Sequence, residues 1–381
     1  MEKNFDIKLF LAKNIVPIVF ITLGAIAAPL SKFTGVYLVQ EIVTRLGRDM
    51  FLVLALLIPL IAGMGINFGL ALGAYAGQFA MILVLNWGIE GVGAMFLAML
   101  VATPIAFLTG LFGGYLLNRA KGREMITTYI MGFFILGLYQ FIVLFVLGKF
   151  VPITNQVILL SRGYGIRNTV KLVGIEGSFD NLFDNLLGVS MKIGGVHLPL
   201  FSILLVAFLC LATWWFRKTK LGQEIRAVGQ DMNVSAASGI KVDRTRIISM
   251  IISTVLAAYG QLIFIQNIGV MTVYSGAQSA ALYSAAALLV GGASVSKAGI
   301  PRVILGTALF HFVFIVMPMA ANRTLGMPAV AEYVRLMVSY SAVAVALIIN
   351  AWNAKKEREY TLFGHRRHID STAIKRRIGQ A

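Results

Sequence analysis

Polar side chains that interrupt long apolar runs are the residues best placed to do chemistry in this chain. They are amides and one imidazole, namely Asn67, Gln78, Gln140, Gln266, Asn267 and His311. Such groups can hydrogen-bond a polar solute, and burying them without a partner is costly, so they are functional candidates by default. We assign Asn67, Gln78, Gln266, Asn267 and His311 to a translocation pathway. The plainer alternative, which we favour for His311, is a hydrogen bond to a neighbouring helix.

Enzymatic chemistry has little support in the residue pattern. His197, His365 and His368 have no partner at the spacing of a metalloprotease helix. The single cysteine, Cys210, excludes an internal disulfide and a cysteine-based zinc site. The P-loop pattern GxxxxGK[ST] does not occur. We therefore expect no catalytic site, metal or cofactor, and we expect any ATP hydrolysis to occur on a separate subunit.

The composition places these candidates in a membrane protein. Of the 381 residues, 58% are hydrophobic and 13% are charged, whereas soluble domains carry about 25% charged residues. The net charge is +17, but the basic residues lie in short segments between apolar runs. That pattern sets membrane orientation and argues against nucleic-acid binding.

The apolar runs predict the elements that must position the polar candidates. Crossing a hydrocarbon core takes about 20 helical residues. Ten runs approach this length: 10–30, 50–65, 67–87, 92–117, 126–148, 199–216, 247–267, 280–296, 301–318 and 333–352. The second and third are either two spans or one broken unit. We predict an all-α, polytopic integral membrane protein with about ten transmembrane helices in a permease domain over 1–352.

Charge predicts the orientation and the energy source. Basic residues concentrate in alternate segments, so the positive-inside rule predicts cytoplasmic N- and C-termini and an extracytoplasmic segment at 148–198. The tail 353–381 carries eight Lys and Arg residues, which favours binding to anionic lipid over regulation of an ATPase. No run carries an Asp, Glu, Lys or Arg near its middle. This favours an external energy source and a neutral or zwitterionic solute.

The N-terminal run and the outer segment each leave an alternative open. Lys3, Lys8 and Lys13 precede the first run as in a signal peptide, but its length favours an uncleaved helix. In the outer segment, an amphipathic helix is predicted by the spacing of Phe179, Leu182, Phe183, Leu186 and Leu187. This helix either caps a gate or, with Arg162, Arg167 and Lys171, docks an acidic binding protein.

Glycines mark a packing stripe and a break. Gly65, Gly69, Gly73 and Gly77 recur at every fourth residue, which brings small residues to one helical face for close packing. Together with Gly63, the stretch Gly65 to Asn67 predicts a helix break at membrane depth. Irregular backbone there is tolerated only inside protein or beside a cavity.

The 217–246 loop predicts two short helices at an angle. Thr219 can cap the first helix and Gly229 can end it in the left-handed conformation. Asp231 can cap the second helix, which Gly239 ends. Leu221, Ile225 and Val228 share one apolar face, and Ser235, Ala236 and Ala237 are small enough for close docking. The basic residues before them, Arg217, Lys218 and Lys220, are assigned to lipid headgroups.

Three motifs carry a resemblance to a known family. Gly222-x-x-Ile225-Arg226-Ala227-Val228-Gly229, followed by Ala236-Ala237-x-Gly239-Ile240, resembles the cytoplasmic coupling loop of ABC importer permeases for ribose, other simple sugars, nucleosides and branched-chain amino acids. Gly65-Ile-Asn-Phe-Gly69 and Gly291-Gly-Ala-Ser294 through Gly306-Thr307 agree with it. The chain departs from the family at Lys297-Ala298-Gly299-Ile300-Pro301, where a Gly-Gly-x-Gly turn is usual. The resemblance covers roughly residues 50–350.

The resemblance implies a function, partners and site residues. It implies a permease subunit in a bacterial-type inner membrane, paired with a second permease as a homo- or heterodimer. ABC ATPase subunits would bind below it and a soluble substrate-binding protein outside. Residues 231–239 would be the coupling helix, with the loop residues Gly222, Glu224, Arg226, Ala227, Gly229, Asp231, Ala236, Ala237 and Gly239 coupling it to the ATPase. In that loop, Asp231 would act as the cap, Ala236 and Ala237 as the docking face, and Glu224 and Arg226 as polar anchors.

The favoured cargo is a simple sugar such as a pentose, then a nucleoside, then a branched-chain amino acid. The alternative is a self-sufficient secondary carrier or channel.

Overall fold

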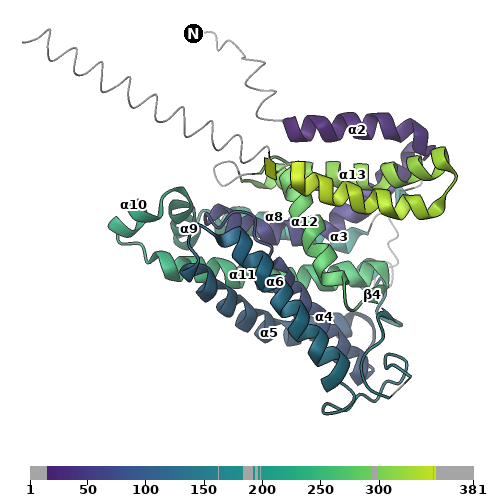
Figure 1. The fold of residues 1–381 in the computed structure, drawn as a ribbon, viewed down its shortest axis with the longest axis horizontal. Helices are drawn as coiled ribbons and strands as arrows, with labels where there is room; N and C mark the ends of the chain where they lie inside the picture. Colours follow the sequence, from purple (N-terminus) through teal and green to yellow (C-terminus); the bar gives the residue numbers. More distant parts are fainter. Residues whose placement is uncertain are drawn as a thin grey trace, which may run out of the picture.

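The computed structural model describes residues 15–161, 163–182, 192–193, 196–197, 199–293, 298–345 and 347–348. Over these residues the chain is a bundle of α-helices with four short strands (Figure 1). The prediction of an all-α polytopic membrane protein is confirmed. Among the described residues, five helices are long and apolar enough to cross a membrane, or six if α8 and α9 are one bent span. The total of ten spans and the placement of the termini stay predictions.

The helices follow the predicted runs in order. The first half of the chain contains α2 (Ile15–Ser31), α3 (Gly35–Ile61), α4 (Leu70–Trp87), α5 (Gly91–Arg119), α6 (Glu124–Phe141) and the π-helix η1 (Ile142–Val146). The second half contains α8 (Leu200–Phe216), α9 (Lys220–Gln230), α10 (Met232–Ala237), α11 (Val242–Ile268), α12 (Gly276–Val290) and α13 (Ile300–Leu325). Residues 328–345 form a further helix.

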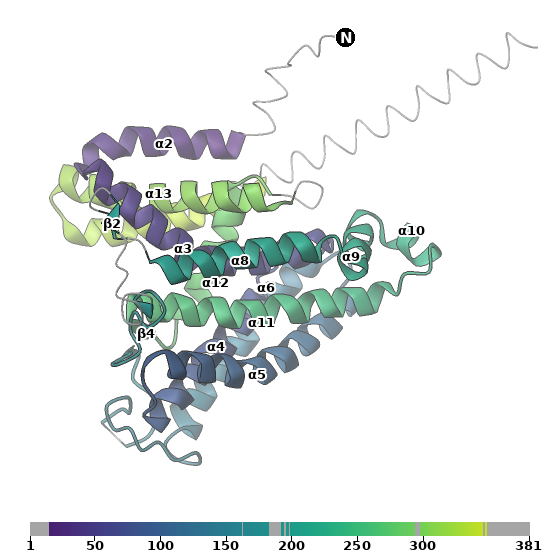
Figure 2. The ribbon, with the colours of Figure 1, turned by 180° about the vertical axis from the view of Figure 1, so that it is seen from behind.

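Helix α11 lies at the centre of the bundle. It packs against α3, α4 and α5, whereas α13 packs against α2, α3 and α12. Figures 1 and 2 show α2 and α13 along one edge, α4 and α5 along the opposite edge, and α11 between them. The short helices α9 and α10 lie at one end of the bundle and β4 at the other. The 217–246 loop and the outer segment are therefore at opposite ends.

Helix α3 corrects the expected second span. Residues 31–49 separate the first two predicted apolar runs, but α3 already begins at Gly35, where Thr34 caps it by accepting a hydrogen bond from the Tyr37 amide. Its 27 residues span about 40 Å at 1.5 Å per residue. Polar and charged residues in the first half lower its hydropathy, which is why the apolar run begins only at residue 50.

The predicted break between α3 and α4 is present, from Ala62 to Gly69. Gly63 and Gly65 adopt positive φ angles of 78° and 66°. A Cβ placed on Gly63 would lie 2.9 Å from the Gly229 Cα in α9. The break therefore lies beside the 217–246 loop, and its depth in the membrane stays a prediction. Because α3 starts earlier than expected, its last residue, Ile61, already lies at the end of the bundle that carries α9.

Two glycines of the stripe bring α4 against α11. A Cβ on Gly73 would overlap the carbonyl oxygen of Thr254, and one on Gly77 would lie 2.6 Å from that of Ala258. The contacts advance along both helices together, so α4 and α11 run parallel. Gly69 contacts Asn67 and Met250. Gly65 has nothing within 4 Å of the position of a Cβ and lies in the break, not on the stripe.

The outer segment forms a strand pair with the residues that follow α11. Strand β1 (Thr169–Lys171) runs antiparallel to β4 (Val270–Thr272), with Val170 opposite Met271. Strands β2 (Lys192–Ile193) and β3 (Val196–His197) form a second pair. Phe179 is buried and its ring packs against Phe96 and Phe201.

Several predictions fall outside the described residues. These concern the N-terminal lysines, Arg162, the amphipathic helix from Phe183 to Leu187, Ser294, Lys297, the tail histidines and the basic tail 353–381.

Candidate coupling and translocation sites

The first site is the elbow formed by α8, α9 and α10. Thr219 caps α9, as predicted, by accepting a hydrogen bond from the Gly222 amide at 3.3 Å. The α9 axis turns by 75° from α8. Gly222 permits this turn because a Cβ there would overlap the Phe216 carbonyl oxygen.

Helix α9 is held against the break between α3 and α4. Ile225 and Val228 are buried and Leu221 packs beside the core, so the predicted apolar face points inward. The expected role of Gly229 as a left-handed helix end is wrong, because α9 continues through it to Gln230. Gly229 instead allows close approach, since a Cβ there would overlap the carbonyl oxygen of Ile61.

Helix α10 presents two of its three predicted small residues to the outside, whereas Ser235 is buried. Asp231 caps it by accepting hydrogen bonds from the amides of Asn233 at 2.8 Å and Val234 at 3.0 Å. Ala236 and Ala237 are exposed, and Val234 is 63% exposed. We call Val234, Ala236 and Ala237 the α10 surface. Gly239 follows the end of α10 and has a left-handed φ of 84°.

The other loop residues border the α10 surface. Arg226 is exposed, and Glu224 and Ala227 are half-buried. Within the described part of the chain, neither Arg226 nor Glu224 has a hydrogen bond or an ion pair that would hold it in place. A surface pocket beside α10 is lined by Lys121, Ala236, Ile240, Lys241, Val242, Asp243 and Arg244. The lining of this pocket is therefore basic, with one acidic group, Asp243, paired to Lys121 at 2.6 Å.

A buried ion pair supports the elbow, and sequence reasoning missed it. The Arg246 guanidinium, which is fully buried, donates to Glu124 at 2.7 Å and contacts the Met232 sulfur at 2.9 Å. These contacts join α11, α6 and the start of α10. Both charged residues were counted as loop residues because they lie at helix ends.

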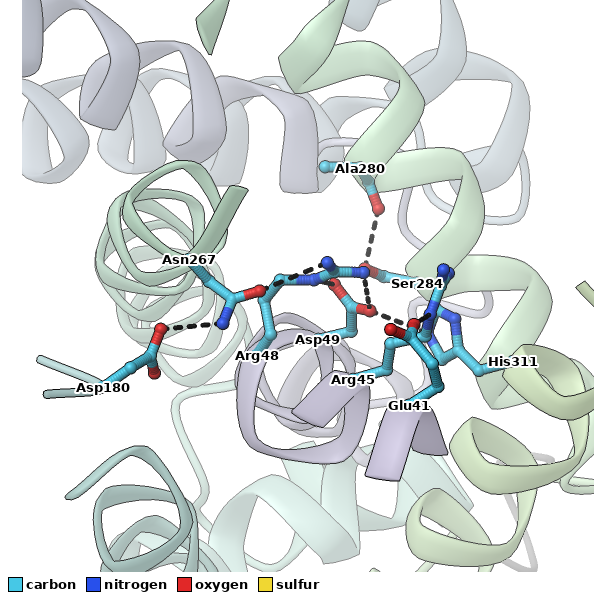
Figure 3. A network of polar contacts seen from close by, with 9 residues as sticks. All are labelled: Glu41, Arg45, Arg48, Asp49, Asp180, Asn267, Ala280, Ser284 and His311. Atoms are coloured by element: carbon cyan, nitrogen blue, oxygen red, sulfur yellow. Dashed lines mark hydrogen bonds and ion pairs between the residues drawn. The ribbon is translucent and has the colours of Figure 1, made fainter. Parts of the chain in front are cut away.

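The second site is a charged network at the middle of α3 (Figure 3). Arg48 donates to both oxygens of Asp49, at 3.0 and 2.9 Å. The same carboxylate lies 3.0 Å from His311 Nε2 on α13. Glu41 accepts a hydrogen bond from Arg45 at 3.2 Å. Arg48 and Asp49 thus put charge near the middle of a 27-residue helix, but α3 is not among the described helices that are apolar enough to cross a membrane.

The network continues to the outer segment. Arg48 donates to Asn267 at 3.3 Å, and Asn267 donates to Asp180 at 2.7 Å. Asp180 also accepts hydrogen bonds from Gln266 and Ser202. Three of the predicted pathway residues, Gln266, Asn267 and His311, thus lie in one network. The helical spacing of Glu41, Arg45 and Arg48 was the available signal, since it puts all three on one face.

Asn67 and Gln78 lie apart from this network. Asn67 is buried beside the break, where it accepts a hydrogen bond from the Gly69 amide at 2.8 Å and contacts the Met250 sulfur at 2.9 Å. Gln78 is buried in α4 and donates to the Thr272 carbonyl at 3.3 Å. The five predicted pathway residues therefore do not form a single site.

Comparison with known proteins identifies the chain's family. The family model of the permease component of branched-chain amino acid transport systems matches residues 17–349. The nucleoside ABC transporter permease protein NupB of Lactococcus lactis is 26% identical over 208 residues, covering 51% of this chain and 52% of NupB. The xylose transport system permease protein XylH of Haemophilus influenzae is 32% identical over 102 residues, covering 27% of this chain and 26% of XylH.

The chain thus spans about half of the first relative and about a quarter of the second. No solved structure matches the chain. The family match extends over most of the sequence, including α9, α10 and the break between α3 and α4. The resemblance carried by the 217–246 loop is thereby confirmed, and the chain belongs to the family of permease components of branched-chain amino acid transport systems.

Proposed function

We propose that this chain forms the translocation pathway of an ABC importer, and that separate ATPase subunits drive it through α10. The contact of Gly229 with Ile61 and Gly63 is the observation that carries this proposal. It joins the exposed elbow directly to the backbone between two long helices. A push on α10 would therefore reach α3 and α4 without passing through a flexible loop.

The α10 surface is the proposed docking site of the ATPase. Its small, exposed side chains permit close contact, and the adjoining pocket offers Lys241 and Arg244 to acidic groups on the partner. Glu224 and Arg226 are available as polar anchors. Opposite charges across such a surface steer association and set orientation.

The remaining partners follow from the same proposal. A second permease, identical or homologous, would complete the pathway, and an extracytoplasmic substrate-binding protein would dock at the outer segment near Arg167 and Lys171. Arg217, Lys218 and Lys220 would contact lipid headgroups of a bacterial inner membrane. The favoured cargo is a simple sugar, followed by a nucleoside. The names of the xylose and nucleoside permeases support that choice.

The substitution Ala236→Glu tests the coupling role. A large acidic side chain on the α10 surface should abolish ATP-driven uptake by the reconstituted complex while membrane insertion and yield stay unchanged. Gln223→Glu is the matched control because it adds the same carboxylate at an exposed position on α9. Normal uptake by well-expressed Ala236→Glu protein would contradict the proposed docking surface.

Affinity purification of the tagged chain from native membranes tests the partners. Stoichiometric recovery of a P-loop ATPase is the expected result, and recovery of a second permease would distinguish a heterodimer from a homodimer. A folded chain recovered alone, and able to move solute without ATP, would contradict the importer proposal.

A self-sufficient carrier is the second candidate, and the Asp49–His311 pair is the observation that favours it. Intramembrane ionisable groups are common in proton-coupled transport. The pure chain in proteoliposomes distinguishes the two candidates. An importer permease should show no uptake driven by a pH gradient alone, whereas a carrier should show such uptake.

A further inference from the structure

Three buried polar atoms at the joint between α4 and α6 have no hydrogen-bond partner. They are the hydroxyl oxygens of Tyr75 and Tyr139 and the side-chain carbonyl oxygen of Gln78; none has a partner among the described residues. The side chains are almost completely buried, with exposures of 2% for Tyr75, 5% for Tyr139 and 0% for Gln78. Such atoms are rare in folded proteins because each one has lost its hydration without replacement.

The three side chains lie close together. The rings of Tyr75 and Tyr139 have centroids 4.8 Å apart and are tilted by 38°. Tyr75 and Gln78 are three residues apart in α4, so they share one face of the helix. The amide nitrogen of Gln78 is anchored on the Thr272 carbonyl, and Gly276 leaves room beside it, since a Cβ there would lie 2.7 Å from that nitrogen.

The positions of Tyr75, Gln78 and Tyr139 along the bundle suit a translocation pathway. Tyr75 and Gln78 lie near the middle of α4, an 18-residue helix that runs from the elbow end to the outer end. Tyr139 lies in α6 one turn before the π-helix η1, a helical form that is frequent at functional sites. The start of η1 is tied to the outer segment, because the Val143 carbonyl accepts a hydrogen bond from the Ile166 amide at 3.2 Å. Tyr274 donates to the carbonyl of the same Ile166 at 2.5 Å.

We propose that Tyr75, Gln78 and Tyr139 are a contact site for a hydroxylated sugar ring during translocation, formed when α6 separates from α4. This inference rests on the proposed function. Two phenol hydroxyls and an amide oxygen can donate to and accept from sugar hydroxyls, and two tilted aromatic rings offer apolar faces to a sugar ring. The three groups are neutral, so they offer no counter-charge to the ammonium and carboxylate of an amino acid.

The sugar ring can come from a free pentose or from a nucleoside, and uptake assays distinguish the two. The probes are radiolabelled D-xylose, uridine and L-leucine, each supplied with its binding protein to the purified complex in proteoliposomes. Removing one hydroxyl with Tyr75→Phe or Tyr139→Phe should raise the KM for the transported sugar or nucleoside about threefold to tenfold, the range for one neutral hydrogen bond. Tyr283→Phe in α12 is the matched control, because its ring packs against Phe310 and Phe314 away from this site.

Melting temperature separates a solute contact from a structural role. If the hydroxyls serve the solute, Tyr75→Phe and Tyr139→Phe should leave the melting temperature unchanged or raise it, because each removes a buried polar group without a partner. If the hydroxyls bond within the resting bundle, the melting temperature should fall, and that result would overturn the inference. Unchanged KM values in both variants would overturn it as well.

Uptake by the wild-type complex distinguishes failure of the sugar-ring site from failure of the proposed importer function. Wild-type uptake without ATP, or no uptake of any of the three probes, contradicts the importer proposal. ATP-driven wild-type uptake of L-leucine alone supports the importer but contradicts the sugar-ring site. ATP-driven uptake of D-xylose or uridine, reduced in the two variants and normal in Tyr283→Phe, is the expected result.

Discussion

The carboxylate of Asp49 accepts two hydrogen bonds from Arg48 and lies 3.0 Å from His311 Nε2. One acidic side chain therefore joins α3 to α13 inside an apolar bundle. Arg48 has a second partner in Asn267, which leads to Asp180 in the outer segment. Loss of the carboxylate would leave the Arg48 guanidinium, whose side chain is only 12% exposed, with the Asn267 amide oxygen as its acceptor, so the position bears on stability.

The substitution Asp49→Asn should lower the free energy of unfolding by about 3–5 kcal/mol, the cost of breaking a buried ion pair by removing one partner. Thermal melting of the detergent-purified protein measures the effect. Glu41→Gln is the matched control, because the Glu41 carboxylate is 32% exposed in its pair with Arg45 and such a pair is worth about 0–1 kcal/mol. Equal losses in both variants would contradict the structural role of Asp49.

At the scale of elements, α9 is packed on the junction of two other helices. Its apolar face is buried through Ile225 and Val228, and Gly229 brings its backbone against Ile61. The Arg246–Glu124 pair holds the neighbouring helices α11 and α6 together beneath it. The elbow is therefore a rigid extension of the bundle. Rigid contact is what transmission of a movement requires.

Gly229→Ala tests this contact. The added methyl would overlap the Ile61 carbonyl, and overpacking of this kind costs about 1–3 kcal/mol. We expect a lower melting temperature and a larger proportional loss of ATP-driven uptake. Gly93→Ala is the control, since nothing lies within 4 Å of its Cβ position in α5. If both variants transport normally, the close approach of α9 to α3 does not matter for coupling.

At the scale of the whole molecule, the elbow and the outer segment lie at opposite ends of the bundle (Figure 2). Helices α4 and α11 run parallel between these ends, as their glycine-mediated contacts show. A binding protein outside and an ATPase inside would thus act on the same two helices from opposite ends.

Cysteine labelling tests this arrangement in the membrane. In a Cys210→Ser background, Val157→Cys places a thiol at a position that is 71% exposed in the outer segment, and Ala236→Cys places one on the α10 surface. A membrane-impermeant maleimide should label Val157→Cys in intact cells. It should label Ala236→Cys only in inverted vesicles. Labelling of both from one side would contradict the predicted orientation.

Local signals in the sequence were sufficient for the membrane class, most helix positions and the family. Apolar runs of near-spanning length predicted the long helices from α4 to α13, because burial in lipid demands continuous apolar surface. Capping residues predicted the elbow, since Thr219 and Asp231 act on amides within three residues. The loop motif led to the family because its glycines and alanines are close together in sequence.

Only the tertiary structure decided which distant residues meet. The start of α3 was missed because Glu41, Arg45, Arg48 and Asp49 lower hydropathy, and their cost is offset by contacts with residues more than 200 positions away, Asn267 and His311. The role of Gly229 was misassigned because a close approach and a left-handed turn both select glycine. Likewise, the unpartnered hydroxyls of Tyr75 and Tyr139 are visible only when α4 and α6 are placed side by side. Hydrophobic periodicity reports the solvent that each residue faces, whereas pairing depends on packing between helices.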